Sequence, residues 1–146
     1  MGAVMIGMDP HKVSVTIEVR DEREVLFATG RFGTDTGGYE AMVRYCRRWP
    51  RRAWAVEGAN GTGRPVAQRL LADGERVPDV PAKLAARARV FDTGNARKTD
   101  AHYAHAIVMV ALRTEVCASS GWTRDWRCCG CWRTAAMSCP DPGRRP

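Results

Sequence analysis

Three segments with the pattern of β-strands follow one another at the start of the chain, and this arrangement restricts the possible folds more than any other feature. Residues Val4–Asp9 form an apolar run that ends in an acid, which is typical of a buried strand. Residues Val13–Val19 alternate between apolar and polar side chains, and a third strand is predicted over Glu24–Phe32. Because the connections are too short for a crossover helix, the three strands are predicted to pair as an antiparallel meander.

Helical and strand patterns alternate after the meander. The expected segments are an amphipathic helix over 39–49 that ends at Pro50, a buried strand Ala53–Glu57, a helix Arg64–Ala72, a short strand Val77–Val80, a short basic helix Pro81–Val90, and a last helix that Thr99 caps and that runs to about Arg113. The order β-β-β-α-β-α-β-α predicts an α/β protein with a mixed sheet covered by helices. This is the element order of the RNase H-like fold.

Three acids lie at the ends of these elements: Asp9 ends the first strand, Glu57 ends the fourth, and Asp100 begins the last helix. In the expected fold the first and fourth strands are neighbours, so the three carboxylates would converge at one edge of the sheet. Carboxylates in one cleft repel each other unless cations lie between them, and two Mg²⁺ ions about 3.5–4 Å apart would support phosphodiester chemistry there. The simpler alternative is that these acids cap helices or lie in solvated loops.

Size and charge limit the class of protein. A chain of 146 residues suits one domain and is too short for a second full domain. No apolar run is long enough to cross a bilayer, and the N-terminus lacks the pattern of a secretory signal, so a cytoplasmic location is expected. The chain has 23 Lys and Arg against 16 Asp and Glu, a net charge of +7. This balance favours an anionic partner, nucleic acid first, although a GC-rich genome also encodes Arg freely.

Two groups of basic residues have different expected roles. The first group lies near the proposed cleft and is expected to contact phosphates: Lys12, Arg64, Lys83, Arg87, Arg89, Arg97 and Lys98. The second group lies at the end of the first helix, where cations suit the helix dipole, and is interpreted as a solvated face: Arg44, Arg47, Arg48, Arg51 and Arg52. The glycine-rich loop 58–63 lacks the Lys-Ser/Thr of a nucleotide-binding P-loop, which argues against nucleotide hydrolysis and favours a turn.

The composition changes at about residue 116. Residues 117–146 hold five of the six cysteines and three of the five tryptophans, and no Leu, Ile or Phe. A zinc site would use Cys128, Cys129, Cys131 and Cys139, but the paired-knuckle spacing is missing, and a disulfide scaffold would need a secreted context. Cys and Trp codons both become Leu, Met or Val codons when read one base earlier, which would give this stretch a helical apolar stripe. We therefore interpret 1–116 as the domain and 117–146 as an out-of-frame, disordered tail.

Three runs of sequence resemble a known family: MIGMDPHKVSVTIEV, WAVEGANGTGRPVAQRLLADG and VPAKLAARARVFDTGNARKTDAHYAHAI. Over residues 4 to about 115 the chain resembles the N-terminal domain of bacterial transposases of the insertion-sequence 110/116/902 type. The resemblance implies a RuvC-like, RNase H-like domain whose DEDD acids bind a divalent metal, Mg²⁺. It also implies a second, C-terminal domain with a catalytic serine, and movement of element DNA with the help of a structured RNA.

The resemblance assigns the acids residue by residue. Asp9 takes the first position, Glu57 the second and Asp100 the third, while Tyr103 stands where the fourth acid is expected. Positions 100 and 103 share a helix face, but a neutral phenol is a poor Mg²⁺ ligand. With the serine-bearing domain also missing, the expectation is a truncated, inactive transposase domain. The alternatives are a non-catalytic nucleic-acid-binding module, which would also form homo-oligomers, and a stand-alone structure-selective nuclease.

Overall fold

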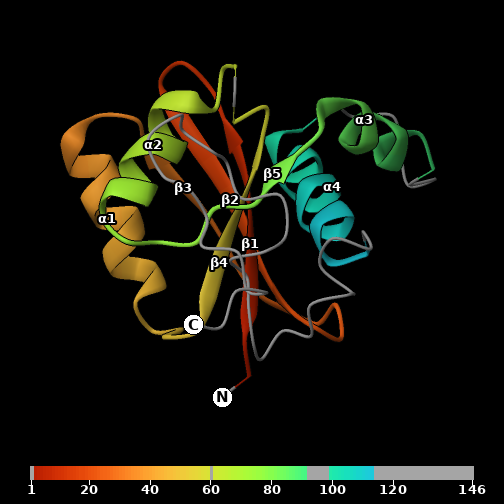
Figure 1. Cartoon of the computed structure of the whole chain (residues 1–146), viewed down its shortest axis with the longest axis horizontal. Helices are drawn as coiled ribbons and strands as arrows, with labels where there is room; N and C mark the ends of the chain where they lie inside the picture. The colour runs from red at the N-terminus through yellow and green to blue at the C-terminus, as the bar shows by residue number, and fades with distance from the viewer. Residues whose placement is uncertain (1, 60, 92–98, 114–146) are drawn as a thin grey trace, which may run out of the picture.

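The computed structural model describes residues 2–59, 61–91 and 99–113, and Figure 1 shows how their helices and strands are arranged. The elements follow the predicted segments, and the order β-β-β-α-β-α-β-α is continued by one more helix: β1 (Val4–Pro10), β2 (Ser14–Asp21), β3 (Leu26–Gly33), α1 (Thr36–Cys46), β4 (Arg52–Glu57), α2 (Arg64–Ala72), β5 (Asp79–Val80), α3 (Ala82–Phe91) and α4 (Asp100–Arg113). None of the helices in these ranges is long and apolar enough to cross a membrane. The tail from 117 to 146 lies outside the described residues.

The strands form one five-stranded sheet in the order β3-β2-β1-β4-β5. Strands β1, β2 and β3 pair antiparallel, which confirms the predicted meander. Strand β4 pairs with β1 in parallel, with Met8 opposite Val56, so the first and fourth strands are neighbours as predicted. The carboxyl ends of β1 and β4 therefore meet at the same edge of the sheet.

Helices cover both faces of this sheet, with α1 and α2 on one side and α3 and α4 on the other (Figure 1). Side chains alternate along β1, so Ile6 and Met8 pack in the core under α1 and α2, whereas Met5 packs against Ile107 of α4. The same alternation places the odd-numbered positions of β1 and β4 on the α4 face. Asp9 and Glu57 are such positions, so the strand register itself directs both acids toward α4.

Strand β2 is buried on both faces, although its sequence alternates. Val15, Ile17 and Val19 fill the core on the α1 side, and the polar residues between them, Ser14, Thr16 and Glu18, are also buried. Helix α4 covers this polar face, where His105 Nδ1 lies 2.8 Å from Glu18 Oε1. The alternating sequence of β2 thus predicts which face of the strand is polar, but it does not predict whether that face is exposed to solvent.

Gly7 permits the close approach of α4 to β1. A Cβ atom at this position would lie 2.5 Å from the Ala104 carbonyl oxygen and 2.7 Å from Val108 Cβ. Because real Cβ atoms do not tolerate such contacts, any larger residue would push the helix away from the strand. The glycine therefore helps to hold the first residue of α4, Asp100, next to the end of β1.

Two expectations near α1 need correction. The helix ends at Cys46 rather than at Pro50, because the chain before this proline tightens into a turn in which the Trp49 N–H donates to the Cys46 carbonyl over 3.1 Å. Arg52 is not part of a solvated face. Its guanidinium is largely buried and makes a bidentate ion pair with Glu75, which also accepts a hydrogen bond from Trp54 Nε1.

Candidate metal centre

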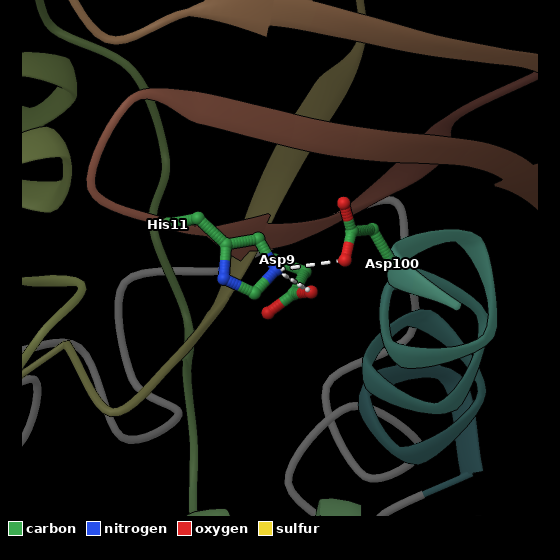
Figure 2. A group of neighbouring side chains, drawn as sticks. All are labelled: Asp9, His11 and Asp100. Carbon is green, nitrogen blue, oxygen red and sulfur yellow. Dashed lines mark ion pairs between the residues drawn. The ribbon is translucent and has the colours of Figure 1, made fainter. Parts of the chain in front are cut away.

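Two of the three predicted acids meet at the carboxyl edge of the sheet. Asp9 is the penultimate residue of β1, and Asp100 is the first residue of α4. Figure 2 shows the side chain of His11 between the two carboxylates. His11 Nε2 lies 2.9 Å from Asp9 Oδ2 and 3.2 Å from Asp100 Oδ1. One donor atom from each residue lies within 4.8 Å of the others, a separation that a single metal ion can bridge.

Local structure explains this convergence. Pro10 ends β1, and the chain turns so that the His11 N–H donates to the Ser14 carbonyl over 2.8 Å, which brings the imidazole back over Asp9. Thr99 caps α4, since its side-chain Oγ1 accepts the His102 N–H over 3.4 Å. The positive end of the α4 dipole lies at this point and favours a carboxylate at Asp100.

Asp9 has an unsatisfied carboxylate oxygen. The side chain is only 10% exposed, and its buried Oδ2 makes no well-aligned hydrogen bond, although His11 Nε2 lies 2.9 Å away. Burial raises the pKa of Asp9 above its usual value, and the positive charge of His11 opposes this shift. A buried oxygen without a donor is costly, and a cation or its bound water would satisfy it.

A second unsatisfied oxygen lies beside the first. Thr16 is the cross-strand partner of Asp9, and its Oγ1 is likewise buried without a hydrogen-bond partner. Side chains at paired positions lie on the same face of a sheet, so both oxygens belong to the α4 face. Two orphaned oxygens on neighbouring strands, next to a carboxylate and an imidazole, form a donor set that fits a divalent cation.

Glu57 does not belong to this cluster. Its carboxylate lies 3.5 Å from Arg89 Nη1, and the Arg89 guanidinium in turn stacks over the ring of Tyr103, with Cζ 4.5 Å from the ring centroid. Burial raises the pKa of Glu57, and the charge of Arg89 opposes this shift. Asp9, Glu57, Arg89 and Tyr103 nevertheless line one open cleft with a volume of about 560 Å³.

The predicted phosphate-binding residues are distributed unevenly. Lys12 is exposed and lines the cleft, and Arg89 lines it while paired with Glu57. Arg64, Lys83 and Arg87 are exposed but are not among the residues that line the cleft. Arg97 and Lys98 lie outside the described residues.

Two residues of the site had no role in the sequence interpretation. His11 bridges the acids, and Arg31 reaches from β3 to Asp100 with Nη1 3.2 Å from Oδ2. The spacing Asp-X-His in the turn after β1 is a detectable signal, because two residues separated by one position can face the same point. Arg31 carries no such signal, since only the pairing of β2 with β3 brings it near α4.

The strand order β3-β2-β1-β4-β5, with helices on both faces of the sheet, is that of the RNase H-like, RuvC-like α/β fold. Among solved structures, the chain is similar to T. thermophilus RuvC in complex with Holliday junction substrate. The TM-score is 0.51 at 14% sequence identity, over 73% of this chain and 91% of that chain, so the likeness concerns the fold. No protein-family model matches the chain, and neither does any curated protein.

Proposed function

We propose that residues 1–116 are the RNase H-like domain of a transposase of the insertion-sequence 110/116/902 type, and that this domain binds DNA and a divalent cation at the Asp9–His11–Asp100 cluster. The sequence motifs support the transposase assignment, and the fold agrees with it. The observation that carries the metal proposal is the convergence of donor atoms from Asp9, His11 and Asp100 at the buried Oδ2 of Asp9. The resemblance also suggests a structured RNA as a partner, and a second copy of the chain is a further proposed partner.

The chain's own residues would prepare this edge for a phosphodiester. Asp9, His11 and Asp100 would each offer one donor atom to the cation, and the Thr16 hydroxyl would orient a bound water. A bound divalent cation would supply charge neutralisation and an acidified water. Lys12 and Arg31 are exposed beside the acids and would attract the nucleic-acid backbone. The presence of one imidazole in the donor set suits Mn²⁺ better than Mg²⁺.

We further propose that this chain does not cleave DNA on its own. Phosphodiester cleavage by paired acids depends on two cations, one at the attacking and one at the leaving oxygen. Here the charge of Glu57 is balanced by Arg89, and Tyr103 supplies a ring to that guanidinium instead of a carboxylate to a metal. The site would therefore hold one cation and position a strand without completing the reaction.

Calorimetric titration of the full chain with Mn²⁺ and Mg²⁺ tests the binding proposal. We expect one site, lost in Asp9→Asn and kept in Asp21→Asn, which changes an acid of the β2–β3 turn. A Holliday junction, the substrate bound by the RuvC structure, is the DNA probe. Binding that weakens with salt and requires Asp9, without nicking, supports the proposal. Metal-dependent nicking that Asp9→Asn abolishes would instead show an active nuclease and contradict the proposed lack of cleavage.

The division of the chain at residue 116 is a separate proposal. We propose that residues 117–146 are translated from a shifted frame, because their Cys and Trp positions become apolar residues at helical spacing in the frame one base earlier. Sequencing the DNA past codon 115 tests this. An open shifted frame that encodes the amphipathic helix supports it, and stop codons at the start of that frame contradict it.

A further inference from the structure

A cavity of about 350 Å³ lies on the α1 and α2 face of the sheet. It adjoins the cleft that Asp9 and Glu57 line on the other face. It lies at the carboxyl end of β1, between the strands and the helices α1 and α2. Four residues line both the cavity and the cleft and form the wall between them: Pro10, His11, Lys12 and Thr62. The volume falls within the range of about 300–1,000 Å³ that small-molecule sites occupy. A chain of nucleotides that crossed this wall would reach both spaces.

The inside of the cavity is apolar and its rim is cationic. Val15 and Met42 are buried side chains of its lining, and Pro65 and Val66 of α2 contribute further apolar surface. Lys12 and Arg69 also line the cavity, and no acidic residue is found among its described lining residues. A ligand that suits these surfaces has a flat apolar part and an attached anion, as a nucleotide does.

Three polar side chains of the lining, Thr34, Tyr39 and Arg69, already contact other groups of the protein, so they are poorly placed to distinguish one base from another. The Tyr39 hydroxyl donates to Asp73 Oδ2 over 2.6 Å, and the Arg69 guanidinium covers the Tyr39 ring with Cζ 4.0 Å from its centroid. The Thr34 hydroxyl donates to the Lys12 carbonyl over 2.9 Å and fixes the turn that forms the wall. The cavity is thus pre-formed, and it would accept different bases with similar affinity.

We propose that this cavity binds one unstacked nucleobase of a DNA strand whose backbone lies in the neighbouring acidic cleft. This inference rests on the proposed function, because the strand reaches the cavity from the Asp9 site. Inside the cavity the base packs against Val66 and the buried Met42, and Lys12 at the shared wall contacts the phosphate outside. The cavity would thereby hold the strand in register over the acids.

Binding of two single-stranded DNA probes to the full chain in Ca²⁺ tests this inference. One probe is a short deoxyoligonucleotide, and the other has the same backbone with every base replaced by an abasic site. We expect the abasic probe to bind about ten-fold more weakly, as for the loss of one stacked base. We also expect the NMR methyl signal of Met42 to shift only with the base-containing probe.

Val66→Trp fills the cavity, and Gln68→Trp places the same side chain on the exposed face of the same helix. We expect Val66→Trp to bind both probes equally and Gln68→Trp to keep the preference for bases. If wild-type protein binds both probes equally in an Asp9-dependent way and the Met42 signal stays unchanged, the base cavity is wrong while the proposed function stands. If neither probe binds, both proposals fail. The two wild-type measurements decide the matter even if Val66→Trp does not fold.

Discussion

The guanidinium of Arg89 lies against the ring of Tyr103, with Cζ 4.5 Å from the ring centroid. Cation–π contacts of this geometry hold a guanidinium in place, and here the guanidinium also faces Glu57. Tyr103 stands at the position where the family resemblance implies a fourth acid. The aromatic ring and the arginine therefore act together on Glu57: the ring holds the guanidinium, and the guanidinium balances the charge of the Glu57 carboxylate.

Tyr103→Asp combined with Arg89→Ala is expected to create a second cation site. The double variant adds a carboxylate near Glu57 and removes the guanidinium, so the added repulsion is relieved only by a cation. Isothermal titration with Mn²⁺ should show two bound ions per chain instead of one, and overall affinity should rise by about ten-fold or more. Tyr103→Phe, which keeps the ring, should leave the stoichiometry unchanged. A double variant that still binds one ion would contradict this account of the cleft.

Thr16→Val is expected to change stability and metal binding in opposite directions. The valine removes a buried hydroxyl that has no partner, so the free energy of unfolding in metal-free buffer should rise by about 1 kcal/mol. If the hydroxyl orients a cation-bound water, Mn²⁺ affinity should fall several-fold in the same protein. Urea unfolding and calorimetry measure the two effects. Thr36→Val, at an exposed position in the first turn of α1 on the other face of the sheet, is the control and should leave Mn²⁺ affinity unchanged. Unchanged Mn²⁺ affinity in Thr16→Val would exclude a role for the hydroxyl.

The sequence predicts the strands and which of them are neighbours well, because strand patterns and short connections leave few alternative pairings. The alternation of side chains along β1 and β4 even predicts that Asp9 and Glu57 lie on the same face of the sheet. The contacts that decide the chemistry come from tertiary packing. The rotation of α3 about its axis brings Arg89 to Glu57, and the pairing of β3 brings Arg31 to Asp100. No local pattern records either contact, because both depend on where distant elements dock.

Gly7→Ala is expected to destabilise the fold and to weaken the metal site together. The new Cβ would collide with α4 backbone and with Val108, and relieving such overpacking costs about 1–3 kcal/mol. Since α4 carries Asp100, its displacement should also lower Mn²⁺ affinity. Gly2→Ala is a matched control, because a Cβ there meets nothing within 4 Å. Urea unfolding of the two variants checks the prediction, and equal stabilities would show that α4 is not packed against β1 as described.

Glu75→Ala is expected to be one of the most destabilising single changes in the described part of the chain. The carboxylate pairs with Arg52, whose side chain is 13% exposed, and accepts from Trp54 Nε1 over 2.8 Å. Its removal leaves a buried charge and a buried indole N–H unpaired, at a cost of about 3–5 kcal/mol. Glu24→Ala breaks a similar pair with Arg113, but Arg113 is 64% exposed, so that loss should stay under about 1 kcal/mol. A similar loss in the free energy of unfolding for Glu75→Ala and Glu24→Ala would contradict the inference that burial makes the Glu75 pair more important for stability.

Asp9→Asn is expected to stabilise the metal-free protein at neutral pH but not in acid. Burial raises the pKa of Asp9 in the folded state above its usual value of 3.8, so folding favours the protonated carboxyl. The stability that this group contributes is therefore fully present below pH 3.8 and is lost as the pH rises through the raised, folded-state pKa. Asparagine is always neutral and avoids that loss. Urea unfolding in buffer that contains a chelator, between about pH 3 and pH 8, measures this. The free energies of unfolding of the two proteins should be similar at the acid end and should differ increasingly as the pH rises. The exposed change Glu22→Gln should give a difference from wild type that does not vary in this way; a constant difference for Asp9→Asn as well would mean that Asp9 is not desolvated in the folded protein.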